Sequence, residues 1–166
     1  MSHQSDTPDG SQISLFLGRA YYSYLGMLGR LLKARGLDRK LRPGIGNVLF
    51  ALQGGRELTA TEIRQQLGMA RSTMARLVEK VRKLGLIETR PDPKDGRAQR
   101  ISLTPEAEAL MPDCFELANH IESVICRGFS AQEHKTFADL LLRATSNINA
   151  ELETLESSSS NQPKSS

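Results

Sequence analysis

The sequence predicts a mainly α-helical fold with one β-hairpin (α+β), and three observations support this prediction. Apolar residues recur at helical spacing along most of the 166 residues. Two of the predicted helices, on either side of Gly68, are separated by a turn of only a few residues. One region, from Ile87 to Leu103, instead has two short segments of strand-like alternation around a turn. This order predicts a winged helix-turn-helix with further helices at both ends.

Apolar stripes and chain breakers set the limits of the outer helices. Glycines follow the first two stripes, and Pro43 suits the first turn of a helix. Thr104 and Pro105 form a cap and a first turn, and Ser130 to Glu133 has capping-box spacing. The outer helices are therefore expected over residues 11–35, 43–52, 104–127 and 130–152.

The helix-turn-helix is expected between residues 59 and 84. Thr59 and Glu62 have the spacing of a capping box, in which a hydroxyl and a carboxylate satisfy the first free amides of a helix. The second helix, from Arg71, has an apolar stripe that would pack inward. Its outer face would carry hydroxyl and basic side chains, of which we single out Arg71, Ser72, Thr73, Arg76 and Lys80.

The charges are distributed unevenly along the chain. Residues 19–42 contain seven basic residues and one acidic residue, and residues 55–104 contain eleven basic and six acidic residues. Residues 105–166 contain four basic and ten acidic residues. A basic middle beside an acidic C-terminal part indicates that one surface faces a polyanion, although solvated helix faces would give a similar pattern.

Duplex DNA is the polyanion that the helix-turn-helix and hairpin together indicate. Side chains at the start of the second helix can reach bases in the major groove, and Lys80 suits phosphate. The loop between the strands carries Lys94 and Arg97, and an arginine at a loop tip can enter the minor groove. An ion pair from Asp95 to an arginine would hold the loop rigid. An ordinary amphipathic helix and a solvated turn are the alternatives.

The region from about Leu58 to Thr104 resembles the DNA-binding core of the MarR family of bacterial transcription regulators. The matching runs are 84–87, 92–97 and 101–104. The family's wing pattern, Asp-x-Arg-Asp-x-Arg, differs here only at Lys94, which keeps the charge but loses the bidentate geometry of arginine. The resemblance assigns the key wing arginine to Arg97 and the loop-bracing aspartate to Asp95, on either side of Gly96.

The resemblance also implies an obligate homodimer with interleaved terminal helices. The first helix carries more apolar residues than a small winged helix can cover, which fits this arrangement. We expect one domain over residues 11–156, with a DNA-binding lobe at 43–104, dimerisation helices at 11–35 and 105–152, and disordered tails at 1–10 and 157–166. The expected function is a sequence-specific, cytoplasmic regulator, a dimeric repressor of a palindromic operator that a small effector releases.

A small lipophilic or phenolic ligand is the effector class that the resemblance implies. Tyr21, Tyr22 and Tyr24 are the aromatic candidates for its pocket, although core or dimer-interface positions are the favoured explanation for them. A thiol switch at Cys114 or Cys126 is the rival mechanism. If one helix carries both cysteines, they lie about 18 Å apart, too far for a disulfide within the chain.

Other classes of function have less support in the sequence. No phosphate-binding glycine loop, nucleophile motif or metal-ligand spacing is present, so we expect no enzyme, cofactor or metal site. No apolar run approaches the length of about 20 residues that a membrane span needs, and no signal peptide is evident. A winged helix that binds an acidic protein partner remains the alternative to DNA binding.

Overall fold

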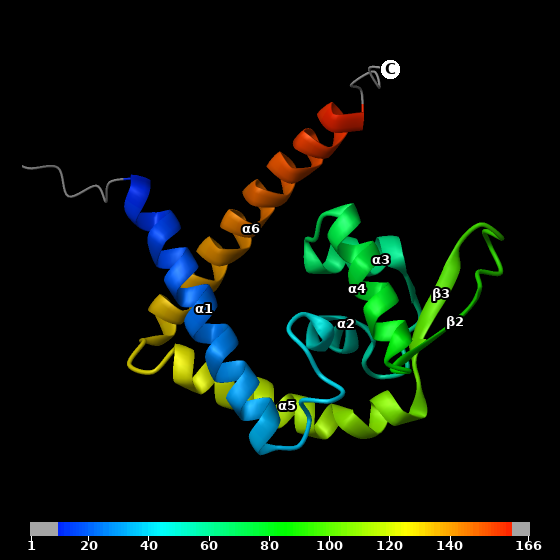
Figure 1. Cartoon of the computed structure of the whole chain (residues 1–166), viewed down its shortest axis with the longest axis horizontal. Coiled ribbons are helices and arrows are strands. Elements are labelled where there is room, and N and C mark those ends of the chain that lie inside the picture. Colours follow the sequence, from blue (N-terminus) through cyan, green and yellow to red (C-terminus); the bar gives the residue numbers. More distant parts are fainter. Residues whose placement is uncertain (1–9, 161–166) are drawn as a thin grey trace, which may run out of the picture. The chain divides into compact units, whose positions relative to one another are not determined.

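The computed structural model describes residues 10–160, and its fold class is the one expected from the sequence (Figure 1). The chain is mainly helical, with a small three-stranded antiparallel sheet in the order β1-β3-β2. The helices are α1 (Gly10–Ala34), α2 (Ile45–Leu52), α3 (Ala60–Leu67), α4 (Arg71–Lys83), α5 (Pro105–Ile125) and α6 (Ala131–Ser160). The strands are β1 (Leu58–Thr59), β2 (Ile87–Pro91) and β3 (Gln99–Leu103).

The chain divides into two compact units between Pro43 and Gly44. The first unit contains α1, which ends where Gly36 adopts a left-handed conformation with φ of 67°. The amide of Gly36 donates to the carbonyl of Lys33, and the amide of Leu37 donates to that of Leu32. These bonds satisfy carbonyls that the end of a helix leaves free, and only glycine adopts this φ without strain.

The second unit is built around the winged helix-turn-helix. Its core side chains come from α2, α3, α4 and the sheet, and the largest of them are Ile45, Leu49, Leu52, Ile63, Met74, Leu86 and Ile101. The hairpin of β2 and β3 pairs Ile87 with Leu103 and Thr89 with Ile101, and it extends beyond α4 (Figure 1). This core fixes the hairpin and α4 on one framework.

Two helix boundaries and one short strand differ from what was expected. Helix α2 begins at Ile45 rather than Pro43, because Gly44 has a left-handed φ of 87° that a helix does not permit. Strand β1 was not expected, since two residues give no alternation to detect. Helix α6 continues to Ser160, although residues 157–166 were expected to be disordered; residues 161–166 lie outside the described part.

Serine hydroxyls explain how α6 accommodates its polar end. The hydroxyl of Ser158 donates to the carbonyl of Thr154 at 2.9 Å, and that of Ser157 donates to the carbonyl of Glu153. Both bonds span four residues within the helix and satisfy the hydroxyls without interrupting it. At the other end of the chain, the expected tail at 1–10 lies outside the described residues except for Gly10, the first residue of α1.

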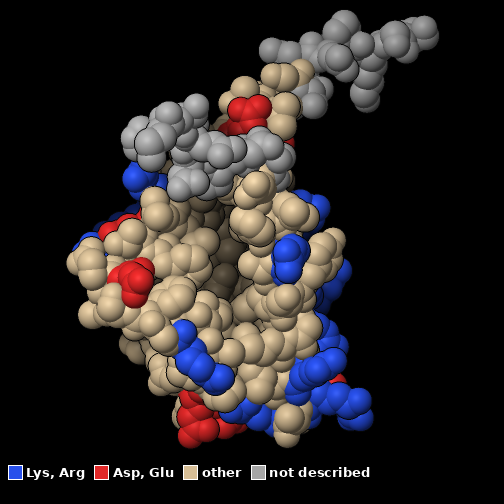
Figure 2. Space-filling view, turned by 90° about the vertical axis from the view of Figure 1, so that its left-hand side faces the viewer, with Lys and Arg blue, Asp and Glu red and all other residues tan. Residues whose placement is uncertain are grey.

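Exposed apolar side chains are confined to the outer helices and their connection. Among the residues that the structure describes, the large hydrophobic residues with high exposure lie before residue 25 or after residue 114. They are Ile13, Leu15, Phe16, Leu17, Tyr21, Tyr22, Tyr24, Phe115, Ile125, Phe129, Phe137, Leu140, Leu141, Leu142, Ile148, Leu152 and Leu155. The face drawn in Figure 2 accordingly carries few charges over most of its area. Apolar surface of this extent is typical of a protein-protein interface.

Within residues 10–160, no helix has the length and apolar character that crossing a lipid bilayer requires.

Candidate nucleic-acid interface

Helix α3 is held at its start by the capping box that the sequence predicted. The Thr59 hydroxyl accepts from the amide of Glu62 at 3.2 Å, and the Glu62 carboxylate accepts from the amide of Thr59 at 2.7 Å. The amide and then the hydroxyl of Thr59 hold the pKa of Glu62 below its usual value. At the far end, Gly68 adopts a left-handed conformation and makes the turn into α4.

Helix α4 presents a basic outer face. Its inner side buries Met74 and Val81. Arg71, Thr73, Arg76 and Lys80 are exposed and Ser72 is half-buried, so the predicted contact residues of this helix lie away from the core. Ala70 precedes the helix and makes no side-chain cap, which leaves its first amides without a side-chain acceptor. An uncapped helix N-terminus of this kind suits an anionic ligand.

The basic residues of α4 fall into two groups. Arg82 and Lys83 form ion pairs with Glu79, at 2.9 and 3.6 Å. Arg71, Arg76 and Lys80 form no ion pair with another residue in the described part of the chain. Their charges are therefore available for an anion outside the protein.

The wing, defined here as residues 92–98 between β2 and β3, is a tight turn built on Asp92. The Asp92 carboxylate accepts from the amides of Lys94 and Asp95, at 2.7 and 3.3 Å. The amide of Asp92 donates to the carbonyl of Ala98 at 3.0 Å. An aspartate that bonds backbone amides two and three residues ahead holds a turn without any help from the core.

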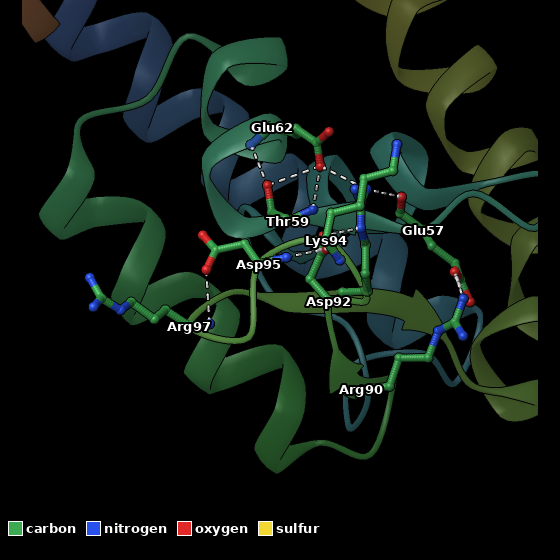
Figure 3. Close-up of polar contacts among 9 residues, drawn as sticks. Glu57, Thr59, Glu62, Arg90, Asp92, Lys94, Asp95 and Arg97 are labelled. Carbon is green, nitrogen blue, oxygen red and sulfur yellow. Dashed lines mark hydrogen bonds and ion pairs between the residues drawn. The ribbon is translucent and has the colours of Figure 1, made fainter.

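A three-way contact made by Arg100 anchors the wing to the helix-turn-helix (Figure 3). Its Nε donates to Asp92 at 2.6 Å, and its Nη1 donates both to Glu62 and to the carbonyl of Glu57, each at 3.1 Å. The amide of Lys94 and then Arg100 lower the pKa of Asp92 against the effect of burial. The wing is thereby joined to the capping box of α3.

This anchor corrects the expected role of Asp95. Among the described residues, the bracing ion pair runs from Asp92 to Arg100, whereas the Asp95 carboxylate accepts from the amide of Arg97, at 2.9 Å, and forms no ion pair. Asp95 is exposed at the turn, and Asp92 is 6% exposed because the turn folds over it. Arg100 was not among the contact residues singled out from the sequence, because its contacts require β3 to pair with both β2 and β1.

The exposed part of the wing carries the other predicted contact residues. Lys94, Gly96 and Arg97 are exposed, and the Arg97 side chain points away from the Arg100 network (Figure 3). Arg97 also lines one groove with Ala75 and Arg82 of α4, and this groove has a volume of about 570 Å³. The wing and the second helix of the helix-turn-helix therefore flank the same open surface.

The other predicted sites are not brought together with this surface by any contact in the structure. Tyr21, Tyr22 and Tyr24 are exposed on α1, in the first unit of the chain. Both cysteines are free, Cys114 buried and Cys126 half-buried. His134 pairs with Glu122 at 2.8 Å, and residues 10–160 contain no cluster of three or more potential metal-ligating side chains.

Comparison with known proteins gives one family. The sequence model of the MarR family matches residues 46–98, which span α2 through the wing. A solved structure described as a probable transcriptional regulator from Pseudomonas aeruginosa is 28% identical, with a TM-score of 0.65, over 80% of this chain and 96% of that one. Two further structures are more distant in sequence but share the fold.

The first is the PcaV transcriptional regulator from Streptomyces coelicolor, in complex with its natural ligand. It is 22% identical, with a TM-score of 0.68, over 87% of this chain and 96% of that one. The second is BpsR from Bordetella bronchiseptica, whose DNA binding is regulated by 6-hydroxynicotinic acid. It is 22% identical, with a TM-score of 0.65, over 81% of this chain and 98% of that one.

Replacing Asp92 with asparagine tests the anchor of the wing. At neutral pH we expect Asp92→Asn to unfold at lower urea concentration than the wild type, because the ion pair with Arg100 is lost. The folded chain lowers the pKa of Asp92, so its charge stabilises the fold above the usual carboxyl pKa of about 4. That stabilisation is lost as the pH falls through the lowered pKa, and the two unfolding midpoints should converge there. Asp95→Asn is the control and should match the wild type; equal midpoints for Asp92→Asn at pH 7 would contradict the anchor.

Proposed function

We propose that this chain is a MarR-family, sequence-specific regulator of transcription that binds operator DNA as a homodimer, a proposal supported by the match of the MarR family model to its winged-helix lobe. The observation that carries the proposal is the set of exposed cations on α4 and on the wing, two elements that line one groove through Ala75, Arg82 and Arg97. Arg71, Arg76 and Lys80 lack internal carboxylate partners in the described part of the chain. DNA phosphates are the polyanion that would complement them.

The proposed binding mode follows from where these groups lie. The first turn of α4 enters the major groove, where Arg71, Ser72 and Thr73 reach base edges or phosphates. Arg76 and Lys80 lie one and two turns further along the helix and pair with the DNA backbone. The exposed wing, with Lys94, Gly96 and Arg97, extends to the adjacent minor groove, and Asp95 shapes the turn that presents Arg97.

The anchor at Arg100 lowers the entropic cost of this binding mode. A wing held by Asp92 and by the capping box loses little conformational entropy when it contacts DNA. Arg100 then holds the wing in place, and Arg97 remains available to contact the DNA.

The homodimer is proposed from the apolar surface of the outer helices. An exposed stripe on α6 includes Leu141, Ile148 and Leu152, and α1 exposes Phe16 and Tyr22. A second copy of the chain would bury these faces under two-fold symmetry. Two-fold symmetry in turn implies a palindromic operator whose half-sites are about 34 Å apart, one turn of DNA. Repression in the cytoplasm, by occupying a promoter, is the proposed outcome.

The proposed effector is a small lipophilic or phenolic molecule. The structure of PcaV contains its natural ligand, and DNA binding by BpsR is regulated by 6-hydroxynicotinic acid, an aromatic acid. In this chain Tyr21, Tyr22 and Tyr24 are the aromatic side chains proposed to contact such a ligand. A thiol switch receives less support, because burial raises the pKa of Cys114, as does the neighbouring charge of Asp113.

Binding to duplexes tiled along the DNA upstream of its own gene tests the function. By fluorescence anisotropy, one palindromic segment should bind far more tightly than the others, and affinity should fall steeply as salt rises. Equal and weak binding to every duplex would favour instead a winged helix that contacts an acidic protein.

Arg97→Ala tests the wing. We expect a loss of affinity for the preferred duplex of roughly fivefold to 150-fold, since an arginine that contacts a base contributes on the order of 1–3 kcal/mol. Thermal stability should be unchanged, because the side chain is exposed and lies outside the Arg100 network. Arg127→Ala, an exposed arginine at the end of α5, is the matched control, and unchanged affinity in Arg97→Ala would remove the wing from the interface.

Leu141→Glu tests the dimer. Light scattering should give twice the chain mass of 18.3 kDa for the wild type. The variant should be monomeric at the same concentration, because a charge in an apolar interface is strongly unfavourable. Asn147→Glu, at an exposed polar position of α6, should remain dimeric. A monomeric wild type would refute the dimer.

A further inference from the structure

The C-terminal part of α6 contacts the helix-turn-helix through three polar bonds. The Asn149 side-chain amide donates to the carbonyl of Gly68, in the turn between α3 and α4. Arg64 of α3 donates through Nη1 to the Glu153 carboxylate at 3.0 Å. The Ser72 hydroxyl, in the first turn of α4, donates to the Glu156 carboxylate. The end of α6 thus lies against the part of the helix-turn-helix that begins α4.

These contacts come from one side of α6. Asn149, Glu153 and Glu156 are spaced by four and three residues, which aligns them along a helix. The exposed apolar residues Leu141, Ile148 and Leu152 occupy a different stripe of the same helix, the one proposed for the second copy. A dimer formed through the apolar stripe therefore leaves the acidic stripe in place.

The charges on the two surfaces are complementary. Residues 144–160 of α6 contain three glutamates and no lysine or arginine. Opposite them, the helix-turn-helix offers Arg64 and the first turn of α4, where Arg71 is exposed and Ala70 provides no side-chain cap. A helix N-terminus with an arginine and a hydroxyl beside it binds phosphate oxygens as readily as carboxylate oxygens.

We propose that Arg64 and Ser72 form a contact site for a DNA phosphate, and that Glu153 and Glu156 occupy this site when DNA is absent. The end of α6 is then an internal competitor of the operator, which must displace it to bind. This inference rests on the proposed function and adds Arg64, which lies on α3 and outside the contacts expected from the sequence. It also gives the acidic end of α6 a role that dimerisation does not require.

The geometry makes the competitor displaceable. The side chains of Arg64 and Glu153 are 30% and 52% exposed, so water screens their attraction. An exposed ion pair of this kind changes an equilibrium by about twofold to fivefold, and the competitor weakens DNA binding by a factor of that size rather than abolishing it.

Single glutamate-to-glutamine changes in the full chain test the competitor. Glu153→Gln should bind the preferred duplex about twofold to fivefold more tightly than the wild type in low salt. Glu151→Gln is the matched control, because Glu151 carries the same charge two residues away, is exposed, and has no hydrogen bond or ion pair with the helix-turn-helix in the described structure. Equal affinities for the two variants would overturn the competitor, since both remove one negative charge from α6.

Arg64→Ala tests the phosphate site itself. Its affinity for the duplex should fall, and the slope of log affinity against log salt should decrease by about one, the signature of one lost phosphate contact. In the Arg64→Ala background, Glu153→Gln should increase the affinity for the duplex no more than Glu151→Gln does, because the contact between Arg64 and Glu153 is already absent. An unchanged slope in Arg64→Ala would mean that Arg64 only holds α6.

Failure of this inference is distinguishable from failure of the proposed function. If the wild type binds one duplex tightly but Glu153→Gln and Glu151→Gln are equal, the function stands and the competitor is wrong. If the wild type and every variant bind all duplexes weakly and alike, both are wrong. Thermal unfolding of Glu153→Gln should shift slightly downwards, because the same ion pair stabilises the DNA-free fold, and a contact that only stabilised the fold would give this shift without tighter DNA binding.

Discussion

The contact of Arg100 with Asp92 and Glu62 is the interaction on which the proposed interface depends. One guanidinium joins the turn of the wing, eight residues before it, to the chain before β1 and the capping box of α3, which lie 43 and 38 residues before it. A guanidinium suits this position because its donors point in fixed directions and its charge does not titrate. The wing is a surface loop, and without this contact only its own turn bonds and the ladder of β2 and β3 would hold it. With the contact, the wing and α4 form one rigid surface, on which Arg97 stays exposed.

The distribution of apolar side chains complements that of charge. In the winged-helix lobe the apolar residues are buried, and the exposed groups on α4 are basic or hydroxyl-bearing. On α1 and α6 the reverse holds, since large apolar side chains are exposed over much of their length. The described surface therefore contains two kinds of region, a basic one suited to a polyanion and an apolar one suited to a second copy. Separating them allows a dimer to form without obstructing the surface that would contact DNA.

Helix α6 combines an apolar stripe with an acidic one, and this combination accounts for its unexpected length. An apolar stripe alone would need the helix only as far as about Leu155. Glu156 lies beyond that point and still contacts Ser72, and serine hydroxyls continue the helix through Ser160 by bonding to its carbonyls. The polar composition that predicted disorder is therefore compatible with helix as far as Ser160, where serine hydroxyls bond to carbonyls of the helix and the glutamates just before them contact Arg64 and Ser72.

The sequence by itself determined the order of elements, the helix-turn-helix and the hairpin, because each of these has a local signal. The Thr59–Glu62 capping box, the turn at Gly68 and the apolar stripe of α4 depend only on residues within a few positions of one another. The tertiary structure decided which aspartate braces the wing, because Asp92 meets Arg100 only once β2 pairs with β3 and the turn folds over the carboxylate, and the pairing of β3 with β1 then brings the same arginine to Glu62. It also decided that α6 ends against Arg64 and Ser72, which are 89 and 84 residues away from their glutamate partners. Contacts over such separations leave no periodicity in the sequence, because the geometry of the packed chain alone brings their partners together.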